Sequence, residues 1–149
     1  MYHVKMAGIT ITLDFKHDRY VSDIVRTYLL SDQERTQHFL TIDYVDEINI
    51  QTNKKHRIFS KNKESIHAMM YYDDDFKHTQ VLVKKDAFAN DFLDQLEYIY
   101  FGMIFLEISF LYGFLPLHGS VIAYQNQGLM FSAPSGTGKS THTRYWQTH

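Results

Sequence analysis

The chain of 149 residues contains no cysteine, only two prolines and only seven glycines. The absence of cysteine excludes a disulfide framework and any metal site built from thiolates. The absence of cysteine also fits a reducing compartment. In addition, the start of the chain lacks the succession of basic, apolar and small residues that is typical of a signal peptide. We therefore expect a cytoplasmic protein.

Net charge is also small, because 15 basic and 17 acidic side chains leave a balance of −2. Such a balance argues against a nucleic-acid partner or an anionic membrane held by bulk electrostatics. Charge is unevenly placed: no Asp or Glu follows Glu107, whereas Lys139 and Arg144 do. The last part of the chain is therefore basic, which suits an anionic ligand.

The apolar content of 44% and the aromatic content of 15% predict a folded chain. Residues 2–15 alternate around Ala7-Gly8 and predict an opening strand or hairpin. The segment 18–30 is ambiguous and could form a helix. Further alternating, β-branched or aromatic segments, separated by polar turns, predict strands at 38–45, 47–51, 57–60, 65–72 and 77–84. We expect a mostly antiparallel sheet over residues 1–85.

A helical pattern follows, with acids and Asn90 at its start and apolar residues at helical spacing from Phe88 to Phe110. The run 98–117 has a single charge, Glu107, so we also consider a membrane span. The carboxylate and two glycines in the run disfavour a span. A helix that is apolar all round predicts a buried core helix, which Pro116 would close.

After the helix, residues 117–124 predict a strand, and the polar turn 125–128 connects it to a second apolar strand in an antiparallel hairpin. That strand leads into the sequence A-P-S-G-T-G-K-S-T at 133–141. It matches the phosphate-binding pattern G-x-x-x-x-G-K-[ST] except that Ala133 replaces the first glycine. An apolar strand before the loop and a helix after it are the context in which this motif binds phosphate.

The chemistry of such a loop rests on backbone N–H groups that cradle phosphate oxygens at the positive end of a helix. Lys139 would reach the outer phosphates, and the Ser140 hydroxyl would bind Mg²⁺. The predicted ligands are thus ATP and Mg²⁺, and an ordinary turn between strand and helix is the alternative. The predicted nucleotide-binding residues are Ser135, Gly136, Thr137, Gly138, Lys139, Ser140 and Thr141.

The residues from Leu117 to Trp146 resemble the start of the kinase core in HPr serine kinase/phosphorylase-like proteins, a family related to the phosphoenolpyruvate carboxykinases. The resemblance rests on Leu117-His118-Gly119, on the hairpin and on the Gly-Lys-Ser turn, in that order. It implies ATP-dependent phosphoryl transfer to a serine hydroxyl of a protein or peptide. His118 matches a histidine near the nucleotide in that family, and a strand-edge histidine bonded to backbone is the alternative.

These patterns predict an α+β fold with an N-terminal, mostly antiparallel sheet and one long buried helix. A β-hairpin then leads into the phosphate-binding loop and the start of a helix, as in an incomplete HPr-kinase/PEP-carboxykinase-like core. The predicted division is a β-rich segment at 1–85 and the helix with the beginning of the core at 86–149. The strand before the loop would leave an exposed sheet edge, through which two copies of the chain could pair.

The family carries its catalytic aspartate and metal-binding acids after the loop, and this chain has no acid there. We therefore name no catalytic residue and expect an N-terminal fragment that binds nucleotide without turnover. The alternatives are a phosphoenolpyruvate carboxykinase-type enzyme and a non-enzymatic module with a vestigial loop. The nine histidines show no spacing typical of a zinc site.

Overall fold

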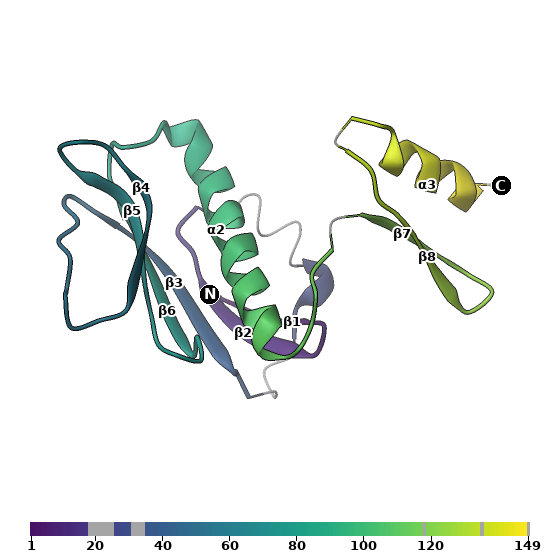
Figure 1. Ribbon diagram of the computed structural model, residues 1–149, viewed down its shortest axis with the longest axis horizontal. Coiled ribbons are helices and arrows are strands. Elements are labelled where there is room, and N and C mark those ends of the chain that lie inside the picture. Colours follow the sequence, from purple (N-terminus) through teal and green to yellow (C-terminus); the bar gives the residue numbers. More distant parts are fainter. Residues whose placement is uncertain (18–25, 31–34, 118, 135, 149) are drawn as a thin grey trace. The chain divides into compact units, whose positions relative to one another are not determined.

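The computed structural model describes residues 1–17, 26–30, 35–117, 119–134 and 136–148 (Figure 1). They form two compact units, Met1–Phe114 and Leu115–His149, which we call unit 1 and unit 2. Unit 1 contains a six-stranded sheet, a short 3₁₀ turn η1 (Arg26–Tyr28) and a long helix α2 (Asn90–Leu111). Unit 2 contains a hairpin and the helix α3 (Lys139–Thr148).

The sheet of unit 1 is mixed, with strand order β1-β2-β3-β6-β5-β4. The pairs β2–β3 and β3–β6 run parallel, and the other three pairs run antiparallel. The strands are β1 (Tyr2–Met6), β2 (Ile9–Asp14), β3 (His38–Val45), β4 (His56–Lys61), β5 (Ile66–Tyr72) and β6 (His78–Lys84). Strand β3 runs parallel to both of its neighbours, β2 and β6. It therefore lies between two antiparallel parts of the sheet, the hairpin β1–β2 and the meander β4–β5–β6.

The opening hairpin is built on a two-residue turn. Ala7 and Gly8 both have positive φ, 51° and 82°, as a type I′ turn requires. Alternation then directs Ile9, Ile11 and Leu13 of β2 into the core, where each is at most 2% exposed. The hairpin predicted for residues 2–15 is confirmed.

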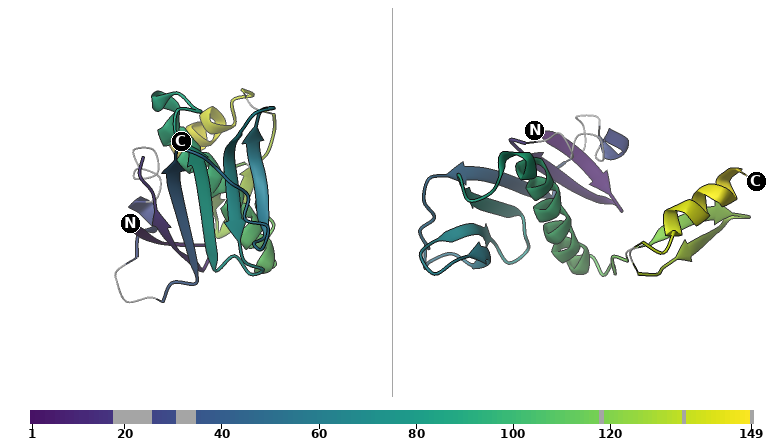
Figure 2. Two further views of the ribbon diagram at one scale, coloured as in Figure 1. Left: turned by 90° about the vertical axis from the view of Figure 1, so that its left-hand side faces the viewer. Right: turned by 90° about the horizontal axis from the view of Figure 1, so that it is seen from above.

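Helix α2 covers one face of this sheet (Figures 1 and 2). Its buried residues recur at spacings of three to four, so they form one side of the helix: Leu96, Tyr100, Phe101, Ile104 and Ile108. They pack in one cluster with the inward side chains of the strands, including Leu40, Ile42, Val81 and Val83. Burial of this apolar side, rather than intrinsic propensity, stabilises a helix of this kind.

The opposite face of the sheet has a smaller apolar cluster of Ile48, Met69 and Tyr71. The segment between β3 and β4 supplies Ile48 and is anchored by Tyr71. The Tyr71 hydroxyl accepts a hydrogen bond from the Gln51 N–H (2.8 Å) and donates one to the Asn49 carbonyl (3.0 Å). This segment is a loop, so the strand predicted at 47–51 is wrong.

The predicted fold class is wrong. The described residues contain eight strands and only two α-helices, so this is a mostly β structure, and the large sheet is mixed rather than mostly antiparallel. Alternation and polar turns identify strands but not the strands with which they pair. Strand β3, for example, pairs with the distant β6 instead of the next strand in the sequence. Most of the ambiguous segment 18–30 lies outside the described residues.

The structure also differs from two further predictions, the long buried helix and the incomplete kinase core. Helix α2 exposes one whole side, including Ile99, Met103 and Phe110 at 41–52%, although an apolar sequence all round suggested burial on every side. In unit 2, β7 (Ser120–Tyr124) and β8 (Gln127–Phe131) form a separate two-stranded sheet. Among the described residues, the strand before the loop thus pairs with one antiparallel neighbour and belongs to no parallel core.

Within the described part of the chain, no helix is both long enough and apolar enough to cross a bilayer.

Candidate functional site

The loop at 133–141 lies in unit 2, between the end of β8 and the start of α3 (Figure 1). The hairpin that carries it turns at Gln125 and Asn126, both with positive φ (50° and 62°). Those values again indicate a type I′ turn, in which Asn tolerates the left-handed conformation. The tight turn fixes the register in which Ser120 faces Phe131 at the end next to the loop.

The loop backbone changes handedness at successive residues. Gly136 and Gly138 have φ of 80° and 84°, and Thr137 between them is not in the left-handed region. Alternation of this kind turns consecutive N–H groups toward one concave side, which forms a nest for anions. A Cβ built on either glycine would meet no atom within 4 Å, so the space beside the loop is open.

Lys139 and Thr137 hold this loop together through its first carbonyl groups. The Lys139 ammonium donates to the carbonyl oxygens of Ala133 (2.6 Å) and Pro134 (3.0 Å). The Thr137 hydroxyl also donates to the Pro134 carbonyl, at 2.8 Å. A positive charge therefore lies next to the nest, and both of its hydrogen-bond partners among the described residues are neutral carbonyl oxygens.

Helix α3 begins directly in the loop, with Gly138 as the residue before its first turn. The His142 N–H donates to the Gly138 carbonyl at 2.9 Å, the first backbone bond of the helix. The amides of the first turn have no acceptor within the helix and carry the positive end of its dipole. Ser140 and Thr141 lie in this turn with exposed side chains, so the geometry favours an anion here.

Helix α3 lies on the hairpin β7–β8 (Figure 2), and aromatic contacts hold it there. The His142 ring meets Phe131 of β8 edge to face at 4.9 Å, and Trp146, one turn later, meets Tyr124 of β7 at 6.3 Å. These partners come from both strands, so the helix cannot turn about its axis without losing one of them. The nest and the helix N-terminus are thereby held in one small unit.

The structure brings most of the predicted binding residues together. Gly136 and Gly138 shape the nest, Thr137 and Lys139 brace it, and Ser140 lies in the first helical turn with Thr141. Ser135 and His118 lie outside the described residues. Unit 2 has no Asp or Glu in its sequence, so the charge of Lys139 is not neutralised by an acid of the same unit.

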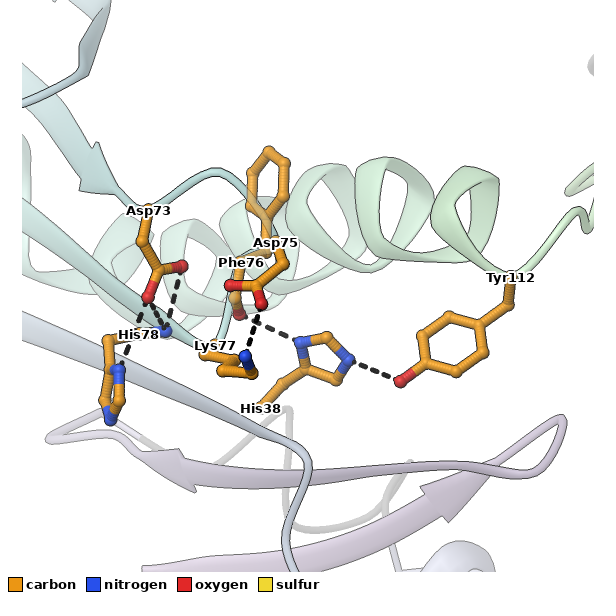
Figure 3. A network of polar contacts seen from close by, with 7 residues as sticks. All are labelled: His38, Asp73, Asp75, Phe76, Lys77, His78 and Tyr112. Carbon is orange, nitrogen blue, oxygen red and sulfur yellow. Dashed lines mark hydrogen bonds and ion pairs between the residues drawn. The ribbon is translucent and has the colours of Figure 1, made fainter.

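Unit 1 contains a second group of polar residues that sequence reasoning missed (Figure 3). The buried His38 ring lies between Phe76 and Tyr112. Because a carbonyl can only accept, Nδ1–H of His38 donates to the Phe76 oxygen (2.9 Å), and Nε2 of His38 shares a hydrogen bond of 2.9 Å with the Tyr112 hydroxyl. These bonds tie the end of α2 to the start of β3.

This group borders an open cavity of about 1100 Å³ at one end of the sheet. The polar residues beside it in Figure 3 contact one another: Lys77 forms an ion pair with Asp75 at 2.5 Å, and Nδ1 of His78 lies 3.4 Å from the Asp73 carboxylate. Asp75 raises the pKa of Lys77 through their hydrogen bond. All four residues lie in one short segment, 73–78. Polar residues around a turn look the same in the sequence whether they line a cavity or face solvent.

No group of three or more His, Cys, Asp or Glu side chains that could hold a metal ion occurs among the described residues. The Ser140 hydroxyl is thus the candidate Mg²⁺ ligand that the chain offers at the loop. One protein ligand is consistent with Mg²⁺ chemistry, because this ion keeps several waters and is bound largely through substrate phosphates.

Comparison with known proteins finds no match to a family model, to a curated protein or to a solved structure. The functional interpretation therefore rests on the geometry of the loop and on its motif.

Proposed function

We propose that the loop at 136–141 binds the phosphates of a nucleotide, with ATP and Mg²⁺ as the ligand. The observation that carries this proposal is the alternation of handedness at Gly136, Thr137 and Gly138 at the start of α3. That backbone presents several N–H groups to one anion. An ordinary turn needs a left-handed glycine at one position only. It does not require left-handed residues at two alternate positions directly before a helix that begins with a lysine.

Each residue has a defined part in the proposed binding. The amides of 136–141 donate to the phosphate oxygens, and Lys139 exchanges the Ala133 and Pro134 carbonyls for the outer phosphates. Ser140 offers one oxygen to Mg²⁺, which then neutralises charge on the phosphates. The resemblance to HPr serine kinase/phosphorylase-like proteins supports ATP as the nucleotide and a cytoplasmic location, where ATP is present.

The proposal is restricted to binding. Phosphoryl transfer needs acids that hold the metal and a group that aligns or deprotonates the acceptor. Unit 2 has no Asp or Glu to hold the metal. In a phosphotransfer assay with serine peptides we therefore expect no product from this chain, and clear turnover would show that these acids are not needed.

Isothermal titration with ATP and Mg²⁺ tests the proposal. We expect heat of binding from the natural chain, a loss of affinity of about tenfold or more in Lys139→Ala, and little change in Lys63→Ala. Lys63 is the matched control, because it is an exposed lysine in a turn of unit 1 and its loss changes net charge equally. Equal, negligible heats from all three proteins would show that the loop is only a turn.

The choice of ligand separates the alternatives. Pyrophosphate should bind through the same loop, whereas AMP should bind much more weakly, because the nest and Lys139 recognise consecutive phosphates. Binding of AMP as strong as that of ATP would place recognition on the nucleoside and contradict the assignment of this loop.

A further inference from the structure

Helix α2 of unit 1 has an apolar side that nothing in the described part of unit 1 covers. Five large side chains at helical spacing form it, which we call the outer stripe: Phe92, Ile99, Met103, Leu106 and Phe110. Their exposed fractions are 37–52%, whereas the residues on the opposite side of the helix are at most 4% exposed. The helix is therefore apolar on both sides, and only one of them meets the sheet.

The outer stripe contains no charged residue. Of the four acids in α2, Asp91 and Asp94 lie in its first turns and Glu97 is fully buried. Glu107 beside the stripe is paired with Arg57, at 2.6 Å. A helix side that faces water normally carries charges, so this composition indicates that the stripe is covered by another apolar surface.

We propose that the outer stripe is a homodimer interface, in which α2 packs antiparallel against α2 of a second copy about a two-fold axis near position 101. Four of the five stripe residues form two pairs that are symmetric about that position, whereas Leu106 has no counterpart in the stripe. Phe92 and Phe110 are equidistant from it, and so are Ile99 and Met103. An antiparallel two-fold pair thus places Phe92 opposite Phe110 of the other copy, and Ile99 opposite Met103. Such self-complementary contacts are what a two-fold interface requires.

Gly102 supports this pairing independently. It lies on the exposed side of α2 next to the proposed axis, and a Cβ there would meet nothing within 4 Å. The packing of unit 1 therefore does not require glycine, which is the least favourable residue in a helix after proline. A glycine at the flank of the stripe, level with the crossing point, lets two helix backbones approach more closely than a larger side chain there would allow.

The available area is sufficient. With about 200 Å² for each large side chain, the exposed parts of the five stripe residues amount to roughly 430 Å². The flanking Tyr98 and Leu111, which are 42% and 51% exposed, bring this to about 620 Å² per copy. A stable interface of standard size buries about 800 Å² per partner, so two copies joined by α2 approach it.

Light scattering or sedimentation of the full chain over a range of concentrations tests the proposal. We expect a dimer that dissociates on dilution. Ile99→Lys and Met103→Glu should each raise the dissociation constant about 100-fold or more, because each buries an unpaired charge. Mixing the two variants should restore a dimer, since the antiparallel register places Lys at 99 opposite Glu at 103.

The control is Ile50→Lys, the same substitution at an isoleucine of unit 1 with a nearly equal exposed fraction, 43% against 41% for Ile99. It should leave the dimer intact. Gly102→Leu should weaken the dimer while the monomer stays folded by circular dichroism, because the space around Gly102 is open.

Three results would overturn the proposal. The first is a chain that is monomeric at every concentration, which would assign the stripe to another partner. The second is a dimer that neither stripe variant weakens, as a sheet-edge contact would give. The third is a mixture of the two folded variants that stays monomeric, which would exclude the antiparallel register.

Discussion

The buried carboxyl group of Glu97 predicts how the stability of unit 1 depends on pH. Glu97 is fully buried on α2, and its Oε1 accepts hydrogen bonds from the Lys16 N–H (3.0 Å) and the Tyr44 hydroxyl (3.1 Å). Its Oε2 is buried and has no hydrogen-bond partner within the part of the chain that the structure describes. Burial raises the pKa of Glu97, and the hydrogen bonds from the His17 and Lys16 amides and from Tyr44 oppose this rise.

The sign of the effect follows from proton linkage. An acid whose pKa is raised by folding keeps its proton in a pH range where the unfolded chain has lost it. The free energy of unfolding therefore falls as the pH rises from about 4.3, the ordinary Glu value, to the folded pKa, and is then constant. One proton limits the slope to about 1.4 kcal/mol per pH unit, and each unit of raised pKa costs about that much at neutral pH.

Glu97→Gln removes this titration and keeps an oxygen that can accept both hydrogen bonds. We expect the stability of the variant relative to the natural chain to increase between about pH 4.3 and neutral pH and then to level. The unpaired amide NH₂ of the variant costs about 1–3 kcal/mol of stability. Because this cost does not depend on pH, it shifts the whole curve of stability against pH without changing its shape.

Urea unfolding followed by far-ultraviolet circular dichroism, at several pH values, measures this difference. The single tryptophan, Trp146, belongs to unit 2, so its fluorescence reports the other unit separately. Glu64→Gln is the matched control, because it is the same substitution at an exposed glutamate of unit 1. A flat or falling difference for Glu97→Gln would refute the reasoning that burial dominates.

Two further substitutions test the packing of each unit. Tyr71→Phe removes two hydrogen bonds to the backbone of 49–51 (2.8 and 3.0 Å) and should destabilise unit 1 by about 1–3 kcal/mol in urea unfolding; an unchanged midpoint would contradict the anchoring role. Gly119→Ala would place a Cβ 2.9 Å from the Phe131 carbonyl oxygen and should destabilise unit 2 by about 1–3 kcal/mol, seen in Trp fluorescence. Gly128→Ala is its control, because the Cβ there has a nearest contact at 4.0 Å, and equal effects at both glycines would argue against the clash.

Local features of the fold were predictable because short-range chemistry determines them. Alternation placed the strands at 38–45 and 65–72 to within a residue or so, and the turn residues at Ala7-Gly8 and at 125–128 identified both hairpins. These signals depend on neighbours in sequence. They carry no information about which strand a buried strand pairs with, which is why the parallel pairing of β3 with β6 was missed.

The burial of α2 shows a second limit. Apolar residues on every side of a helix are typical of a buried helix, but they do not show that one folded unit covers every side. The same sequence pattern therefore fits a buried core helix and a helix with an outward association surface. Only the positions of the strands, which leave Met103 and Phe110 exposed, separate the two.

For the candidate site, the motif predicted the composition of the loop, and the structure adds its backbone. The left-handed conformations of Gly136 and Gly138 on either side of Thr137, and the contacts of Lys139 with two carbonyl groups, could not be derived from the pattern alone. The polar group around His38 had no sequence signal, because its members come from β3, the β5–β6 turn and the end of α2.

The central claim is that backbone amides of the loop bind phosphate, and amide chemical shifts measure this directly. In a titration of the ¹⁵N-labelled chain with ATP and Mg²⁺, we expect the largest shifts at Gly136, Gly138, Lys139 and Ser140, and the same set with pyrophosphate. Lys139→Ala should reduce the shifts at equal ligand concentration. Shifts that are absent from these amides, or larger in unit 1 than in the loop, would contradict the account.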